Sequence, residues 1–355
     1  MKIAFFGSSL VSSYWNGAAT YYRGLIRALD ARGHRVTFFE PKAFDRQANR
    51  DIADPPWAAV VVFEPTESAA LAAVERARDA DVLVKASGVG VLDDLLEEAV
   101  LDAADGATAV FWDVDAPATL ARLEAAPDDP LRTLVPRYDL ILTYGGGEPV
   151  VRRYRDLGAR ECVPIYNALD PETHHPGARD RRFACDLAFL GNRLPDREAR
   201  VEEFFLRAAE LAPGLSFLLA GAGWDDKPLP PNVRVLGHVS TNDHNAFNST
   251  PLVVLNVLRE SMAENGWSPA TRVFEAAGAA ACLISDDWQG IEAFLDPGRE
   301  VLVARSGDDV AKLLHGLVPE RAGAIGRAAR RRVLREHTYA HRAEQVESIL
   351  SRVPA

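Results

Sequence analysis

The chain has 355 residues, 48% of them hydrophobic, and a formal net charge of −11. This length exceeds one ordinary hydrophobic core, so we expect two domains, and the apolar fraction excludes a disordered chain. The negative charge argues against DNA or RNA as a partner, because a phosphate backbone is bound by an excess of lysine and arginine. It leaves room for a single nucleotide, which needs only a local positive site.

The cysteines and the apolar segments bear on the cellular compartment. Cys162, Cys185 and Cys282 are odd in number and far apart, which favours reduced packing residues over a disulfide framework or a zinc site. The first apolar segment is too short for the core of a signal peptide, and no apolar run is long enough to span a bilayer. We therefore expect a cytoplasmic protein without an integral membrane segment.

Apolar runs alternate with helical patterns through the first half of the chain. Strands are predicted near Ile3–Phe6, Val36–Phe39, Val60–Phe63, Val82–Val84, Ala109–Phe111 and Leu140–Leu142. A helix is predicted over Ala19–Ala31. Continuous apolar strands separated by helices indicate a parallel sheet covered on both faces, and such sheets bind ligands at the carboxyl ends of their strands.

Small and charged residues follow several of these strands. Gly17 lies just before the first helix, where a glycine lets the backbone approach a ligand, although an ordinary turn explains it as well. The G-x-G-x-x-G fingerprint is absent there, which counts against a dehydrogenase. Lys85 and the glycines 145–147 also follow strands, and they can line a ligand site or lie in surface loops.

Two carboxylates, Asp113 and Asp115, follow the strand that ends near Phe111. Asp113 is a candidate for a general base, or for a group that positions an acceptor hydroxyl. The pair can alternatively hold Mg²⁺ or Mn²⁺ against a diphosphate. In a third interpretation, Asp115 caps the helix that Pro117 opens, and Asp113 lies in the loop.

A polar, proline-containing stretch over Glu172–Asp180 indicates a domain boundary, and a second alternating set follows it. Its strands are predicted at Asp186–Leu190, Ser216–Ala220, Val233–Leu236, Leu252–Leu255, Ala281–Ile284 and Val301–Ala304. We predict an N-terminal domain over residues 1–168, a C-terminal domain over 169–336, and a C-terminal helix over 337–355 that packs back towards the first domain.

The most informative segment is a predicted helix that Ser268 caps, Pro269 opens and Gly278 ends. Helical spacing places Ser268, Thr271, Arg272 and Glu275 on one face. A helix N-terminus attracts anions, and the guanidinium of Arg272 suits a phosphate. Glu275, one turn later, can accept hydrogen bonds from the two hydroxyls of a ribose. The segment is therefore a candidate site for a nucleoside diphosphate, although Arg272 and Glu275 can also simply pair on a surface helix.

Other strand ends of the second half carry polar or aromatic residues. Arg193 and Arg197 follow a strand and a glycine, where a diphosphate would lie, and salt bridges to Asp196 or Glu198 explain them equally well. Further candidates for the same ligand are Trp224, Asn256 and Arg259. Trp224 can stack on a base or close the edge of a core.

The histidines indicate no metal site. His174 and His175 fall in the linker and are expected to be solvated. His337 and His341 have the i, i+4 spacing of a metal pair, but no HExxH glutamate and no third ligand accompany them. We predict neither a metal ion nor a cofactor.

The ordered set of these motifs resembles glycosyltransferases of the GT-B fold. The segments that carry the resemblance are Asn16-Gly17, Gly33-His34-Arg35-Val36, Pro164–Pro171, Gly191-Asn192-Arg193, Leu218–Gly223 and Arg272–Gly278. The stretch from Ser268 to Val301 and the tail Glu336–Arg342 are similar to the CgeB-like (spore maturation protein) branch of that family.

The resemblance implies two Rossmann-like domains with parallel sheets facing a central cleft, and C-terminal helices. It implies metal-independent transfer of a hexose or pentose from a UDP, GDP or dTDP sugar to an acceptor, which can be a glycan, a protein or a small molecule. Glu275 would hold the donor ribose, Arg193 and Arg272 would meet the diphosphate, and Gly17 would shape the loop between acceptor and donor.

One position departs from the family pattern and keeps other functions open. Retaining members carry a glutamate eight positions before the ribose glutamate, and here that position is Trp267. The alternatives are a nucleotide-sugar epimerase of the same fold and a non-catalytic protein that binds a nucleotide or a glycan.

Overall fold

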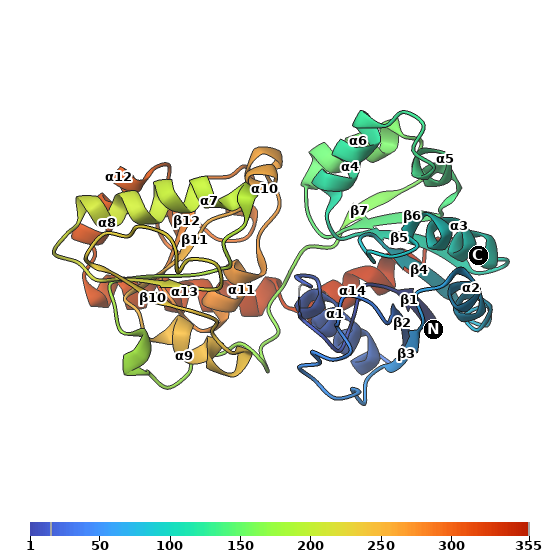
Figure 1. Cartoon of the computed structure of the whole chain (residues 1–355), viewed down its shortest axis with the longest axis horizontal. Helices are drawn as coiled ribbons and strands as arrows, with labels where there is room; N and C mark the ends of the chain where they lie inside the picture. Colours follow the sequence, from blue (N-terminus) through green and yellow to red (C-terminus); the bar gives the residue numbers. More distant parts are fainter. Residues whose placement is uncertain (15, 354–355) are drawn as a thin grey trace. The chain divides into compact units, whose positions relative to one another are not determined.

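The computed structural model describes residues 1–14 and 16–353, which form two compact units. Unit 1 comprises Met1–Asn167 and Tyr339–Ala355, and unit 2 comprises Ala168–Thr338 (Figure 1). The chain thus leaves unit 1 once, completes unit 2, and returns for its last helix.

Unit 1 contains a parallel sheet with the strand order β3-β2-β1-β4-β5-β6-β7. Its strands are β1 (Lys2–Phe6), β2 (Arg35–Pro41), β3 (Ala59–Phe63), β4 (Val82–Ala86), β5 (Thr108–Asp113), β6 (Leu140–Thr143) and β7 (Cys162–Pro164). The order reverses between β1 and β4, and ligands of doubly wound sheets bind at such a switch point.

The helices of unit 1 cover both faces of this sheet. They are α1 (Ala19–Ala31), α2 (Glu67–Glu75), α3 (Asp93–Ala103), α4 (Ala116–Ala125), α5 (Leu131–Leu134), α6 (Gly147–Asp156) and α14 (Tyr339–Leu350), with a 3₁₀ turn at Val135–Arg137. Gly24 of α1 lies against the ring of Tyr339, where a Cβ atom would come within 2.2 Å of a ring carbon. This close approach lets the last helix pack on the first.

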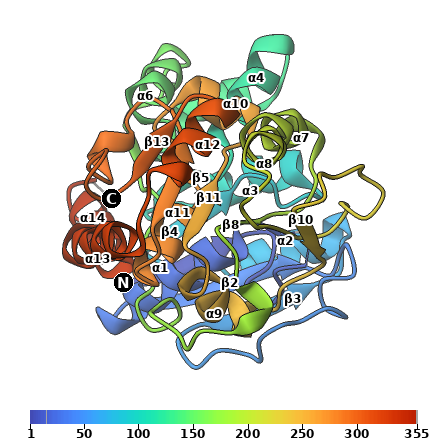
Figure 2. The same cartoon turned by 90° about the vertical axis from the view of Figure 1, so that its left-hand side faces the viewer.

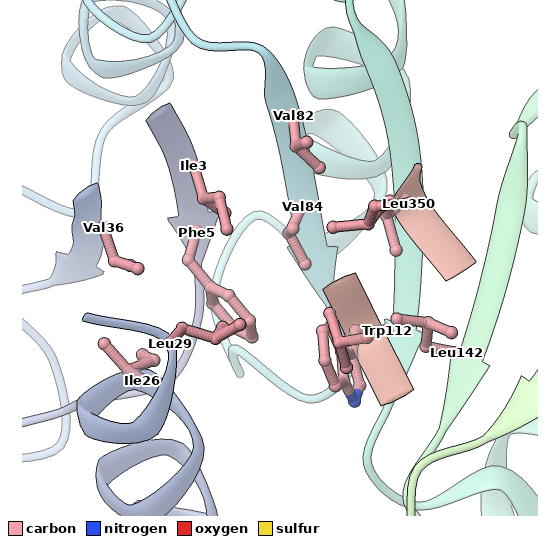
Figure 3. A pocket seen from close by; sticks show the side chains of 12 residues that line it. Ile3, Phe5, Ile26, Leu29, Val36, Val82, Val84, Trp112, Leu142 and Leu350 are labelled. Atoms are coloured by element: carbon pink, nitrogen blue, oxygen red, sulfur yellow. The ribbon is translucent and has the colours of Figure 1, made fainter. Parts of the chain in front are cut away.

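A small cavity lies between the sheet and the helices α1 and α14 (Figure 3). Its volume is about 10 Å³, and apolar side chains such as Phe5, Leu29 and Leu350 line it. A space of this size and polarity holds no ligand and offers a water no hydrogen bond. It belongs to the core rather than to a site.

Unit 2 contains a second parallel sheet, with the order β10-β9-β8-β11-β12-β13. Its strands are β8 (Leu187–Leu190), β9 (Phe217–Ala220), β10 (Val233–Leu236), β11 (Val253–Asn256), β12 (Leu283–Asp286) and β13 (Leu302–Ala304). The order reverses between β8 and β11, so the loops after these two strands flank the switch point of unit 2.

Helices lie on both faces of the second sheet (Figure 2). They are α7 (Pro195–Val201), α8 (Arg207–Leu211), α9 (His244–Ser249), α10 (Glu260–Asn265), α11 (Thr271–Gly278), α12 (Gly307–His315) and α13 (Pro319–Glu336). One π-helical turn joins α7 to α8 at Glu202–Leu206, and 3₁₀ turns occur at Arg181–Phe183, Thr241–Asp243 and Ile291–Ala293.

The side chains of β8 alternate between the two hydrophobic cores that cover the two faces of the second sheet. Leu187 and Phe189 belong to the core formed with α7, α8 and α12, whereas Ala188 and Leu190 belong to the core formed with Phe247 of α9. Successive side chains of a strand point to opposite faces, so both sides of the strand are buried. This explains the continuous apolar run in the sequence.

The helix expected to be capped by Ser268 and opened by Pro269 begins at Thr271 instead. The N-cap position is Ala270, whose methyl group cannot accept a hydrogen bond from the first turn. The hydroxyl of Ser268 donates to the carbonyl of Gly266 at 2.9 Å. Ser268 is buried and precedes the helix, so its side chain is not part of the first turn of α11.

Among the described residues, no helix has the length and the apolar character that crossing a membrane requires.

Candidate functional site

Three arginines meet at the switch point of unit 2. Arg197 lies on α7 after β8, Arg259 lies just before α10 after β11, and Arg272 lies in the first turn of α11. Burial and the neighbouring charges of Arg272 and Arg259 lower the pKa of Arg197 to about 10, although Asp196 acts in the opposite direction. Three positive charges close enough to act on one another favour an anion beside them.

Two of the three guanidinium groups keep donors unused. In the part of the chain that the structure describes, Arg272 forms no hydrogen bond and no salt bridge, and only the charge of Glu275 opposes the burial that lowers its pKa. Arg197 donates from Nη2 to the carbonyl of Asn192 at 2.5 Å, but its buried Nε has no partner among the described residues. Arg259 donates from Nε to Asp196 at 2.5 Å. Buried donors without partners cost free energy, which a bound oxyanion would recover.

Arg193 differs from these three arginines because two carboxylates already neutralise it. Its Nη2 lies 2.7 Å from Glu198 and its Nη1 lies 2.8 Å from Asp226. Of the two interpretations drawn from the sequence, the structure shows the salt bridge. Arg197, the other arginine that the sequence places after this strand, keeps an unused donor instead.

A buried ion pair fixes the loops that carry this cluster. Arg200 of α7 donates to Asp286 at the end of β12 at 2.7 Å, and to the carbonyl of Leu258 at 3.2 Å. Asp286 also accepts from the backbone of Leu258 at 3.0 Å. Burial raises the pKa of Asp286 even though Arg200 lies beside it. The pair ties α7, the loop after β11 and β12 together, and it was not predicted, because its two members lie 86 residues apart in the chain.

Two further residues expected to bind the ligand are structural. Trp224 is only 1% exposed, and its indole N–H donates to the carbonyl of Gly191 at 2.8 Å, so the ring closes the core and has no face for a base. Asn256 is also 1% exposed, and its amide donates to Ser285 at 3.0 Å and to Asp286 at 3.4 Å. The expectation that these two residues bind the ligand is wrong, because both side chains are buried and bonded within the protein.

Glu275 and its surroundings complete the site on α11. The carboxylate is mostly buried and lies 3.8 Å from Nε2 of His174, with His244 close by. His174 is itself 5% exposed, so the expectation of a solvated linker histidine is wrong. The loop that carries it packs on α11, where a Cβ atom at Gly278 would lie 2.9 Å from the His174 carbonyl. Thr271, the first residue of α11, is half-buried one turn before Glu275.

Asp113 of unit 1 is fully buried and has four donors. Its Oδ1 accepts from Ser87 at 2.7 Å, Thr119 at 2.9 Å and the backbone N–H of Asp115 at 3.0 Å, and its Oδ2 accepts from Tyr154 at 2.5 Å. These hydrogen bonds connect β5 to α4, to α6 and to the residue that follows β4. Because all of its contacts are internal and it is shielded from solvent, Asp113 cannot act as a general base, and that expectation is corrected. Asp115 occupies the N-cap position of α4, but its side chain forms no capping hydrogen bond.

The remaining candidates of unit 1 lie near strand ends. Gly17 is exposed, and within the described part of the chain no atom lies within 4 Å of where a Cβ atom would be, so the backbone there is open. Lys85 is fully buried and donates to Asp93 at 2.8 Å, which excludes it as a free phosphate ligand. Gly146 and Gly147 have φ values of +94° and +52°, a region that glycine adopts without strain, and they start α6.

Comparison with solved structures identifies the fold. Anabaena HepE, in a complex with UDP and glucose, aligns with a TM-score of 0.69 at 14% identity over 99% of each chain. The sucrose-phosphate synthase of Thermosynechococcus elongatus aligns with a TM-score of 0.70 at 13% identity, over 99% of this chain and 98% of the other. T4 phage BGT, bound to its UDP-glucose substrate, gives 0.61 at 12% identity over the whole of both chains.

The chain has the GT-B fold. The prediction of two Rossmann-like parallel-sheet domains with C-terminal helices is thereby confirmed. Within this GT-B chain, residues 197–348 match the family described as Glycosyl transferase-like, a segment that holds Arg197, Arg259, Arg272 and Glu275. A search of curated proteins finds no match. The CgeB-like branch is not specifically supported by these comparisons.

Proposed function

We propose that this GT-B chain is a glycosyltransferase that moves a sugar from a nucleoside-diphosphate sugar to an acceptor hydroxyl. The observation that carries the proposal is the cluster of Arg197, Arg259 and Arg272 at the switch point of unit 2, with Arg272 unpaired. The match of residues 197–348 to a glycosyltransferase-like family supports it. The sugar-nucleotide complexes of HepE and BGT are consistent with a nucleotide sugar as the donor.

Each residue of the cluster has a role in this proposal. Arg197 and Arg272 contact the diphosphate, and Arg259 adds charge beside it. The N-terminus of α11, with Thr271, faces the same anion, and Glu275 accepts hydrogen bonds from the ribose hydroxyls. As the bond to the sugar breaks, negative charge grows on the diphosphate, and fixed guanidinium groups stabilise it without reorganisation. The positive charge supplied by these arginines makes a metal ion unnecessary for the leaving group.

The acceptor binds unit 1 in this proposal, close to the carboxyl ends of its strands. The open backbone at Gly17 and the glycines that start α6 are the candidates for its contacts. Asp113 acts indirectly, because its four hydrogen bonds hold the strand ends on which the acceptor would rest. The proton of the acceptor hydroxyl is therefore taken by a group other than Asp113.

The first test is thermal unfolding with UDP, GDP, dTDP, CDP and ADP, each with and without EDTA. A ligand that binds only the folded state adds about 2.7 kcal/mol of stability at a hundred times its dissociation constant. We expect one diphosphate to raise the melting temperature and EDTA to leave the shift unchanged. Sugar transfer is then sought with the matching nucleotide sugar. Product formed from the donor alone would instead indicate an epimerase, and binding without turnover on any acceptor would indicate a binding protein.

A set of arginine variants separates the cluster from its neighbours. Arg272→Gln and Arg197→Gln each remove a charged hydrogen bond to the diphosphate, worth about 1.5–3 kcal/mol, so nucleotide affinity should fall about ten- to 100-fold. Arg299→Gln is the matched control, because that side chain is 78% exposed in a loop of the same unit. Wild-type affinity in Arg272→Gln, measured by titration calorimetry, would contradict the assignment.

A further inference from the structure

A second feature of unit 2 is a cluster formed by His174, His244 and Glu275. Each residue offers one ligand atom, and these atoms all lie within 4.8 Å of one another. Nε2 of His174 is 3.8 Å from the Glu275 carboxylate, and both residues are buried. The three come from separate segments: the loop after the unit boundary, the first residue of α9, and α11. Tertiary structure alone brings them together.

The second ring nitrogen of His174 already has a hydrogen-bond partner. Nδ1 of His174 lies 2.9 Å from the hydroxyl of Thr173, which itself donates to the carbonyl of Asp170 at 3.3 Å. When a ring N–H donates to such an oxygen, the other nitrogen keeps its lone pair and its orientation. Metal-binding histidines show this arrangement, in which the second nitrogen donates to a carbonyl or another oxygen.

We propose that His174, His244 and Glu275 bind a divalent zinc-class ion. Two imidazoles and one carboxylate form a donor set that zinc takes in tetrahedral sites whose fourth position is left to water or a ligand. Metal–ligand bonds of about 2.0–2.2 Å place ligand atoms roughly 3.3 Å apart, so the side chains must close by about 1.5 Å at most. Magnesium should not bind, because it prefers a shell of oxygen ligands.

The ion would compete with the nucleotide rather than assist it. Glu275 belongs to this cluster and, in the proposed function, to the ribose contact, so one carboxylate serves two ligands. The positive charge of Arg272 nearby suits an anion and does not favour a cation. The metal site itself does not rest on the proposed function, whereas the competition does.

The direct test is a cobalt titration of the full chain without an affinity tag. We expect saturable visible absorption of tetrahedral Co²⁺ at one equivalent, its loss on addition of Zn²⁺, and no effect of a large excess of Mg²⁺. Absence of a saturable band, or displacement of cobalt by Mg²⁺ as readily as by Zn²⁺, would overturn the proposal.

Variants locate the ion within the chain. His174→Gln, His244→Gln and Glu275→Gln should each abolish the band, and His175→Gln should keep it, because His175 is the exposed neighbour of His174. Thr173→Val is a milder change at an exposed position that removes only the hydroxyl beside Nδ1, and it should weaken cobalt binding about ten- to 100-fold. Wild-type cobalt affinity in both His244→Gln and Thr173→Val would refute the site.

A competition experiment separates this inference from the proposed function. Saturating Zn²⁺ should raise the apparent dissociation constant of the nucleotide that stabilises the chain. If no nucleoside diphosphate binds, the proposed function fails, and the cobalt titration still decides the metal site by itself. If a nucleotide binds and Zn²⁺ leaves its affinity unchanged in a protein that holds cobalt, the shared role of Glu275 is wrong.

Discussion

Glu97 is a carboxylate that unit 1 buries without a close cation. The side chain on α3 is 2% exposed, its Oε2 has no hydrogen-bond partner among the described residues, and Arg122 approaches Oε1 only to 4.0 Å. Burial raises the pKa of Glu97 to about 7, against the attraction of Lys85 and Arg122. The folded protein therefore holds this proton more tightly than the unfolded chain does.

This difference predicts how stability depends on pH. Because the folded state binds more protons than the unfolded state between about pH 4.5 and 7, the contribution of Glu97 to the free energy of unfolding falls as the pH rises through that range. The loss approaches about 3 kcal/mol above pH 7. Glu97→Gln removes the charge, so it should be more stable than wild type at pH 8 and similar at pH 5.

Urea denaturation at several pH values measures this effect. Glu98→Gln, a change at the exposed neighbouring residue of α3, is the control and should follow the wild-type curve. An equal difference between Glu97→Gln and wild type at pH 5 and pH 8 would contradict the predicted proton linkage.

At the residue scale, the sequence predicts what depends on local spacing and misses what depends on distant partners. Helical spacing placed Arg272 and Glu275 one turn apart on α11, as the structure has them. It could not tell Arg193 from Arg197, because Arg193 is neutralised partly by Asp226, which lies 33 residues along the chain. Asp113 was taken for a catalytic group for the same reason, since its partner Tyr154 lies 41 residues away.

At the element scale, the segment that leads into α11 is held in an unusual conformation. Gly266 and Trp267 have φ values of +68° and +49°, and the N–H of Trp267 donates to the carbonyl of Gln289 at 2.7 Å. A left-handed conformation costs a residue with a side chain roughly 1–2 kcal/mol. The ring of Trp267 covers Gly290, where a Cβ atom would lie 2.3 Å from a ring carbon. The turn therefore depends on a glycine beneath the tryptophan.

Two glycine substitutions separate backbone strain from this contact. Gly290 and Gly298 both have positive φ values, +92° and +81°, but a Cβ atom at Gly298 meets nothing within 4 Å. Gly298→Ala should cost about 1 kcal/mol of unfolding free energy from the backbone alone. Gly290→Ala should cost about 1–3 kcal/mol more by displacing Trp267, and it should also weaken nucleotide binding at α11. Equal losses in the two variants, measured by urea denaturation, would show that the ring contact contributes nothing.

The elements themselves were largely predictable, and the exceptions have local causes. Apolar runs marked twelve strands of the two sheets to within about two residues, because a strand buried on both faces is continuously apolar. The N-cap of α11 was placed two residues early, at Ser268 instead of Ala270, since the hydroxyl of Ser268 closes the Gly266 turn instead of capping the helix. The three-residue strand β7 was too short to be distinguished from the boundary segment.

At the scale of the whole molecule, both ends of unit 2 lie side by side. The N–H of Leu169 donates to the carbonyl of His337 at 2.8 Å, and Leu169 pairs with Thr338 as an isolated parallel bridge. Length and composition predicted two domains but not this pairing, which joins residues far apart in the sequence. Unit 2 is thus a continuous segment with paired ends, inserted before the last helix of unit 1.

The insertion predicts different outcomes for two fragments. A fragment of residues 168–338 should unfold cooperatively on its own, because it keeps its whole sheet and both cores. A chain that stops at Thr338 lacks α14 and exposes the apolar surface on which Val346 and Leu350 pack, so only unit 1 should lose stability. Calorimetry of both fragments checks this, and equal unfolding temperatures of unit 1 with and without α14 would contradict it.

The same connectivity determines when each unit can finish folding during synthesis. Ribosomes extend a chain by about 5–20 residues per second, and domains usually fold in the order in which they emerge. Here the first 167 residues emerge early but lack their closing helix until residues 339–350 have been made, whereas the inserted segment is complete before that. The nascent N-terminal sheet thus waits on the order of ten seconds or more with part of one apolar face, the part that α14 covers, exposed. That interval is when this protein is most exposed to aggregation and has the greatest need of a chaperone.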